Sequence, residues 1–475
     1  MGRFVVCSLG LAHVASVVLC HAAMAQWTYE YVPLDTFWWG NERSVEGPAT
    51  LSFTDLSQWH QEYRQDAYWN GTYQYSFGIQ VLPAMRTPSN GDYVKLLGFL
   101  NGANSDITIV AQNNTPEGLE QIRLGYSNSR GERYQIDLDG YTWSVGSFTA
   151  LGYGGSSSTN PTNALLKNGI LNAENFAPGG RGSTITIGAG AVVNTGFAGG
   201  GNDPDDTDAL YIRNGGMLNA VNLVPGGGNP QGFTVGVDSG GVLNTESSLI
   251  ALDSIPLYPD AYGVIASIDG LWLNNGTVTV GPYGNVVVST TGNLQTRSLE
   301  VAGGTIGHSG GTLSIDGGVF DNGGGDLDIT SSTGSPLMRF VNGATAHQTD
   351  VNLGLTFGEN GSLQVSGQGA GGAPSAVIAD GYFRVGDEGT GTLTVDEGGR
   401  VEAGAANRIY VGFDVRGVGH LTADHLGEVN AGDILVLGYS GNGHADVKNG
   451  AAVTVNALTT GAVHLAAAAP QDTLD

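Results

Sequence analysis

A short phrase recurs along this chain and constrains its fold more than any other feature. One or two glycines are followed by a spacer, an aliphatic residue, usually asparagine, and then alanine or threonine. Its copies span Ala189–Thr195, Gly215–Ala220, Gly240–Thr245, Gly398–Ala403, Gly427–Ala431 and Ala451–Ala457. Because a turn and a short strand return at a nearly constant interval, the phrase predicts a stacked solenoid whose units bury their apolar faces against their neighbours.

The asparagines of the phrase are regularly spaced. Asn194, Asn219 and Asn244 are 25 residues apart, and Asn430 and Asn456 are 26 residues apart. In stacked parallel coils an equivalent position recurs above itself, so the amides can form a hydrogen-bonded ladder. Asparagine also tolerates the left-handed turn conformation. We therefore expect a ladder or turn role for these residues in preference to a binding role.

Between the copies, short alternating segments are separated by glycines and show no helical period. Examples are Ser183–Ile187, Thr277–Val280, Leu299–Val301 and Leu327–Ile329. This pattern predicts an all-β chain in which residues 163–465 form a right-handed parallel β-helix.

The region before the repeats has a different composition. Residues 26–150 contain six of the seven tryptophans and only 12 of the 78 glycines. Alternation over Gly71–Leu82 and Arg133–Leu138 predicts strands, and an amphipathic face over Asp55–Trp69 suggests one short helix. We expect a small, aromatic-rich, sandwich-like β domain or cap, joined to the β-helix by a Gly/Ser linker at 151–162.

The first 25 residues have the pattern of a signal peptide. Arg3 precedes an apolar run from Phe4 to Cys20, and Ala23-Met24-Ala25 resembles a cleavage site. Both cysteines lie in this segment, so the remaining chain contains no thiol. No later stretch has 18 uninterrupted apolar residues, which predicts no membrane span. We expect a secreted bacterial protein, with residues 466–475 as a tail.

The charge balance restricts the partners. The formal net charge is −26, from 44 acidic and 18 basic residues. This balance argues against nucleic acid and anionic lipid as ligands. It is typical of a soluble extracellular β protein, and divalent-cation binding is the alternative explanation.

Two groups of residues are candidate binding sites, and each has a structural alternative. Asp203, Asp205, Asp206 and Asp208 could bind Ca²⁺ through their oxygens, or they could form a solvated turn. Trp38, Trp39, Trp59 and Trp69 could stack on sugar rings, or they could fill a small β core. No other cofactor is expected.

The C-terminal third contains three similar segments, Phe383–Val401, Ile409–Ala423 and Leu435–Val447, with Gly386, Gly412 and Gly438 spaced 26 residues apart. They resemble the repeat shared by autotransporter (type V secretion) passengers and PEP-CTERM surface proteins. The resemblance implies a β-helical passenger or surface stalk with no common catalytic residues. It is confined to this third of the chain, and from the last residues of the sequence we expect neither a translocator barrel nor a Pro-Glu-Pro anchor.

These features together predict a secreted structural or adhesive β-solenoid protein that is not an enzyme. The alternative is a polysaccharide-active or polysaccharide-binding β-helix protein, although the ten basic residues of the repeat region are scattered and form no catalytic pattern. Expected partners are polysaccharides or other cell-surface components. Self-association through the last coil, near Leu458–Leu465, is a further expectation. An unpaired strand edge presents backbone N–H and C=O groups that can pair with a strand of another chain.

Overall fold

The structure is a computed structural model. It describes residues 27–39, 49–69, 72–96, 106–125, 132–150, 161–179, 182–200, 208–225, 233–250, 264–404 and 406–460. The predicted signal peptide, the predicted tail and residues 151–160 of the predicted linker lie outside these ranges.

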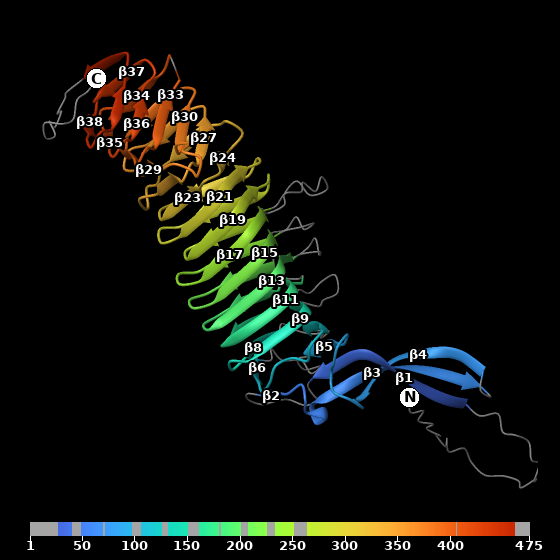
Figure 1. Ribbon diagram of the computed structural model, residues 1–475. Coiled ribbons are helices and arrows are strands. Elements are labelled where there is room, and N and C mark those ends of the chain that lie inside the picture. Colours follow the sequence, from blue (N-terminus) through green and yellow to red (C-terminus); the bar gives the residue numbers. More distant parts are fainter. Residues whose placement is uncertain are drawn as a thin grey trace, which may run out of the picture.

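The chain forms a long parallel β-helix with a small antiparallel piece at its N-terminal end (Figure 1). This arrangement confirms the all-β solenoid predicted from the repeats. The largest sheet follows the whole rod and contains β1 (Trp27–Trp39), β3 (Trp59–Trp69), β4 (Thr72–Pro83), β5 (Tyr93–Leu96), β7 (Leu119–Leu124), β9 (Thr142–Ala150), β11 (Gly169–Pro178), β13 (Ala191–Gly200), β15 (Met217–Pro225), β17 (Val242–Ile250), β19 (Leu271–Val280), β21 (Asn293–Val301), β23 (Thr312–Asp316), β24 (Val319–Asp321), β26 (Leu337–Val341), β27 (Thr345–Gln348), β29 (Asn360–Ser366), β30 (Ala376–Ala379), β32 (Thr390–Asp396), β33 (Arg400–Ala403), β35 (Val418–Ala423), β36 (Glu428–Asn430), β38 (Asn442–Val447) and β39 (Ala452–Thr454).

Each coil is completed by a strand of a second or a third sheet. The second sheet serves the N-terminal part of the rod, and the third serves the C-terminal part. The second sheet contains β2 (Ala49–Leu51), β6 (Asp106–Ala111), β8 (Glu132–Asp137), β10 (Thr162–Lys167), β12 (Thr184–Ile187), β14 (Asp208–Ile212), β16 (Phe233–Val237), β18 (Val264–Ile268), β20 (Gly284–Val288) and β22 (Thr305–His308). The third contains β25 (Leu327–Ile329), β28 (Val351–Leu353), β31 (Phe383–Val385), β34 (Arg408–Val411), β37 (Ile434–Leu437) and β40 (Ala457–Thr460).

The antiparallel piece consists of β1, β3 and β4. Trp39 pairs with Trp59 and Trp27 with Trp69 across β1 and β3, and β3 pairs with β4 in turn. The helix expected at Asp55–Trp69 is therefore wrong. Only a 3-10 turn forms at Leu56–Gln58, and the residues after it join β3, because strand pairing on both sides satisfies their backbone groups.

Parallel stacking begins before the point predicted from composition. β5, β7, β9 and β11 pair in parallel, so coils precede residue 163 and no separate sandwich forms among the described strands. Trp143 lies beside Leu171, and Phe148 lies beside Phe176 with ring centroids 5.8 Å apart. The change from aromatic to aliphatic composition therefore reflects the residues that fill the core, and the backbone pairing continues across it.

The cross-section of the coil changes near residue 310. From β5 to β21, one strand of the largest sheet alternates with one strand of the second sheet. β21 then pairs with both β23 and β24, which divide the long strand into two, and the third sheet replaces the second. Gly317, with φ 75°, lies at the break between β23 and β24.

The three C-terminal glycines share one turn geometry. Gly386, Gly412 and Gly438 have φ values of 72°, 73° and 64°. A Cβ atom on Gly386 would lie 2.2 Å from the carbonyl oxygen of Val418, so a larger residue does not fit. Gly386 accepts a backbone hydrogen bond from the residue after Gly412, and the regular spacing of these glycines therefore corresponds to stacked coils.

Candidate functional site: an asparagine-lined groove

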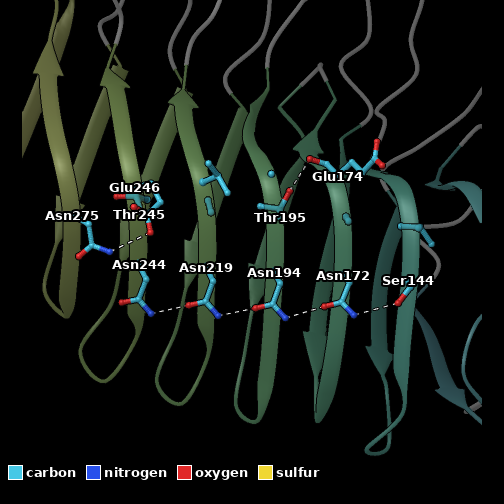
Figure 2. Close-up of a pocket in the computed structure, with 15 residues that line it drawn as sticks. Ser144, Asn172, Glu174, Asn194, Thr195, Asn219, Asn244, Thr245, Glu246 and Asn275 are labelled. Atoms are coloured by element: carbon cyan, nitrogen blue, oxygen red, sulfur yellow. Dashed lines mark hydrogen bonds between the residues drawn. The ribbon is translucent and has the colours of Figure 1, made fainter. Parts of the chain in front are cut away.

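Four asparagines form a hydrogen-bonded row across successive coils of the largest sheet (Figure 2). The side-chain nitrogen of Asn194 donates to the oxygen of Asn172 at 2.9 Å, and Asn219 donates to Asn194 at 2.7 Å. Asn244 continues the row by donating to Asn219 at 2.7 Å, and Asn172 ends it by donating to Ser144 at 3.2 Å. The ladder predicted for Asn194, Asn219 and Asn244 is confirmed.

The position of each amide follows from the phrase in the sequence. In a strand, successive side chains point to opposite faces. The aliphatic residue before each asparagine points inward, as with Leu171, Val193, Leu218 and Leu243, all fully buried. The asparagine between this residue and the next inward one is then on the outer face. Since the strands pair without a register shift from β11 to β17 at this point, the amides lie one above another.

The ladder forms one side of a groove with a volume of about 670 Å³. The opposite side consists of the residues two positions further along each strand, Glu174, Gly196, Val221 and Glu246, with Asn275 at the next coil. Ala173, Thr195, Ala220 and Thr245 line the groove between these two sides. The volume is within the range of about 300–1,000 Å³ that is common for ligand sites.

Sequence reasoning missed two members of the ladder. Asn172 belongs to the segment Gly169-Ile-Leu-Asn-Ala173, which is another copy of the phrase. This copy lies closer to the following one than the later copies lie to one another. The intervening loop is shorter than the later ones, so the regular period did not include Asn172. Ser144 has no such signal, and only its register with Asn172 places it in the row.

The ladder ends after Asn244 because the next coil has an apolar residue at the ladder position. Leu273 takes the ladder position, and Asn274 points inward, where it is buried. The Asn274 side-chain nitrogen donates to the Thr245 hydroxyl at 2.7 Å, and the Trp272 indole donates to the same hydroxyl at 2.9 Å. A buried polar cluster therefore closes the C-terminal end of the row.

The second pair of asparagines takes the turn role that was the alternative to a ladder. Asn430 lies beside Thr454, not beside Asn456. Asn456 donates to the backbone oxygen of Gly432 at 2.9 Å, and Asn430 accepts from the backbone nitrogen of the same glycine at 3.0 Å. The coil between β36 and β39 is shorter than the spacing of the two asparagines, so Asn456 falls beyond the ladder position and into the following turn.

The charged groups in the groove are acidic. Glu174 and Glu246 are exposed, and Asn275 donates to a carboxylate oxygen of Glu246 at 3.3 Å. The described residues that line the groove include neither lysine nor arginine. The groove is therefore an amide-rich surface with two carboxylates at its edge.

Of the four aspartates proposed as a calcium site, only Asp208 lies in the described residues. It is buried at the start of β14, and its carboxylate accepts a hydrogen bond from the backbone nitrogen of Ser183 at 2.9 Å. Asp208 thus has a structural contact with the preceding coil. Calcium binding at Asp203, Asp205 and Asp206 stays a prediction.

Among the four tryptophans proposed to bind sugars, Trp59 can be placed in detail. Its side chain is 1 % exposed, its indole nitrogen donates to the backbone oxygen of Ser52 at 3.0 Å, and its ring stacks on Phe53. Trp59 is therefore a core residue, and its proposed role in sugar stacking is corrected. The side chains of Trp38, Trp39 and Trp69 lie outside the described part of the structure.

In the described part of the chain, no three histidine, cysteine, aspartate or glutamate side chains are placed to hold a metal ion. The same residues include no helix that is long and apolar enough to cross a membrane. Comparisons with protein-family models, curated proteins and solved structures found no match for this chain.

Proposed function

We propose that the protein is a non-catalytic structural and adhesive component outside a bacterial cell, and that its groove binds a polysaccharide. The observation that carries this proposal is the amide row, which crosses the coils from β9 to β17 on the outer face of the rod. A linear polymer aligned with the rod meets the same polar group at each coil. Export is supported by the signal-peptide pattern of residues 1–25.

The spacing of the carboxylates supports binding in preference to hydrolysis at this groove. Glu174 lies on β11 and Glu246 on β17, with β13 and β15 between them. Three strand spacings correspond to about 14 Å. Glycosidases place their two catalytic carboxyl groups about 5–5.5 Å apart for retention or about 6.5–9.5 Å apart for inversion. The two glutamates are too distant for either arrangement.

A binding and turnover experiment tests the proposal. Full-length secreted protein would be sedimented with a panel of insoluble neutral and acidic polysaccharides, beside the Asn194→Leu/Asn219→Leu variant. We expect binding of the unaltered protein to at least one polysaccharide, and loss of that binding in the double variant. Asn222→Leu is the matched control, because Asn222 lies on the same strand as Asn219 but does not line the groove.

The same samples would be assayed for release of reducing or unsaturated sugar ends. Time-dependent product that disappears in Glu174→Gln or Glu246→Gln would overturn the non-catalytic assignment. Equal binding by the unaltered protein and the double variant, or binding to no polysaccharide, would overturn the role of the groove.

A further inference from the structure

We infer that the groove selects an uncharged, extended, β-linked polysaccharide that lies parallel to the solenoid axis. This inference rests on the proposed function and adds the class of the ligand and its direction. Three properties of the groove lead to it: the unused hydrogen-bonding groups of the ladder, the repeat distance between them, and the sign of the nearby charges.

The ladder amides keep half of their hydrogen-bonding capacity. An asparagine amide carries two N–H donors and two oxygen lone pairs. In the described structure, Asn194 and Asn219 each use one N–H toward the preceding coil and one lone pair toward the following coil. Each therefore offers one donor and one acceptor on a partly exposed face. A sugar hydroxyl is both donor and acceptor, so it matches such a pair.

The repeat distance fits one sugar per coil. Neighbouring strands lie about 4.8 Å apart, and the amides follow this spacing because they occupy paired positions. One sugar unit of an extended β-linked chain has nearly the same length. Successive sugars of an extended β-1,4-linked chain face opposite ways, so an equivalent hydroxyl returns at every second coil. A chain along the axis can therefore present one kind of hydroxyl to Asn172 and Asn219, and another kind to Asn194 and Asn244.

An extended peptide along the same axis fits less well. Its side chains return to one face every second residue, which corresponds to about 6.6 Å. That distance is not matched to the coil spacing, so a peptide loses register with the amides after one or two coils.

The small residues Ala173 and Ala220 between the two sides leave the groove open along its length.

The charges exclude polyanions in low salt. Glu174 and Glu246 lie on the edge of the groove, no basic residue among those that the structure describes lines it, and the whole chain carries a formal charge of −26. A polyuronate would place carboxylates next to these groups without a counter-charge. Repulsion of this kind falls as salt screens it.

Calorimetric titration tests the ligand class. The full-length protein would be titrated with a soluble uncharged β-1,4-linked glucose oligomer, with polygalacturonate, and with an uncharged peptide of β-forming sequence. We expect binding of the glucose oligomer, about tenfold weaker binding after Asn219→Leu, and unchanged binding after Asn222→Leu. Glu174→Gln/Glu246→Gln should permit weak binding of polygalacturonate, because the substitution removes the two carboxylates at the groove.

The outcomes separate this inference from the proposed function. Binding of polygalacturonate by the unaltered protein that Asn219→Leu abolishes would overturn the uncharged class and leave a polysaccharide-binding groove in place. Ladder-dependent binding of the peptide would overturn the register argument. Absence of ladder-dependent binding to any polysaccharide would overturn both the inference and the proposed function. If Asn219→Leu fails to fold, Asn244→Ala at the end of the row replaces it.

Discussion

The side-chain nitrogen of Asn219 donates a 2.7 Å hydrogen bond to the side-chain oxygen of Asn194, and the two residues are direct neighbours on β15 and β13. They are 25 residues apart in the chain, yet their side chains are in direct contact. This relationship joins the repeat in the sequence to the groove on the surface.

Asn219→Ala should weaken the coils around β15. Asn219 donates to Asn194 and accepts from Asn244, so the substitution removes two side-chain hydrogen bonds. Each is worth about 1 kcal/mol, and we expect a loss of about 1–2 kcal/mol. Hydrogen exchange of β13, β15 and β17 measures the loss locally, which suits a solenoid that can open coil by coil. Asn175→Ala, at an exposed position of the nearby strand β11 where the described structure has no side-chain hydrogen bond, should change exchange less; equal effects would contradict a special role for the ladder.

Leu426→Gly should stabilise the protein. Leu426 has φ 65° and is 67 % exposed, and the equivalent turn positions in the neighbouring coils are Gly398 and Gly450, with φ 77° and 75°. The left-handed conformation costs a leucine roughly 1–2 kcal/mol, and part of the gain is offset by the greater freedom of glycine in the unfolded chain. We expect a net gain of about 0.5–1 kcal/mol, seen as a higher melting temperature.

Gly450→Ala is the converse of that substitution. The nearest atom to a new Cβ atom at this position is a Leu426 methyl group at 3.5 Å, so space is available and only the backbone conformation opposes the change. A lower melting temperature is expected. If Leu426→Gly lowered the melting temperature as well, strain at this turn would not be the cause.

The stability of the coil that contains β22 should depend on pH through His308. Burial lowers the pKa of His308 from 6.5 to about 4, against the opposing effect of its hydrogen bond with the backbone of Gly311. As pH falls from 6.5 toward 4, the unfolded chain takes up a proton that the folded chain does not bind. The contribution of neutral His308 to the free energy of unfolding is therefore fully present above pH 6.5. It is lost as pH falls through this window, by up to about 3 kcal/mol.

Thermal melting between pH 7.5 and 4 compares His308→Gln with the unaltered protein. The variant should lose less stability as pH falls, and the difference between the two curves should develop between pH 6.5 and 4. His420→Gln is the control, since His420 is exposed. Parallel pH curves for the unaltered protein and His308→Gln would contradict the assignment.

Trp59→Ala should destabilise the N-terminal end without affecting polysaccharide binding. The substitution empties a fully buried site next to Phe53 and leaves the Ser52 carbonyl without its indole donor. Loss of a buried tryptophan costs about 3–5 kcal/mol. Urea unfolding followed by tryptophan fluorescence measures this cost, and sedimentation with polysaccharide checks binding. A folded variant with weaker binding would return Trp59 to a ligand-binding role.

Much of the fold could be read from local pattern. The alternation around each asparagine determines which side chains point inward, because successive residues of a strand face opposite sides whatever the neighbouring coil contains. The recurrence of Gly386, Gly412 and Gly438 likewise indicated stacked coils, since their left-handed turns exclude larger residues. These features depend on a few consecutive residues, and the sequence states them directly.

Which residue lies above which was decided only by the tertiary structure. The length of each loop sets the register between coils, so Asn172 joins the ladder across a short loop while Asn456 misses the position above Asn430. The same register turns Asn274 inward and places Glu174 across from the ladder to form the groove. A repeat in the sequence determines the unit of this protein, whereas contacts between units, which depend on residues far apart in the chain, determine its surface.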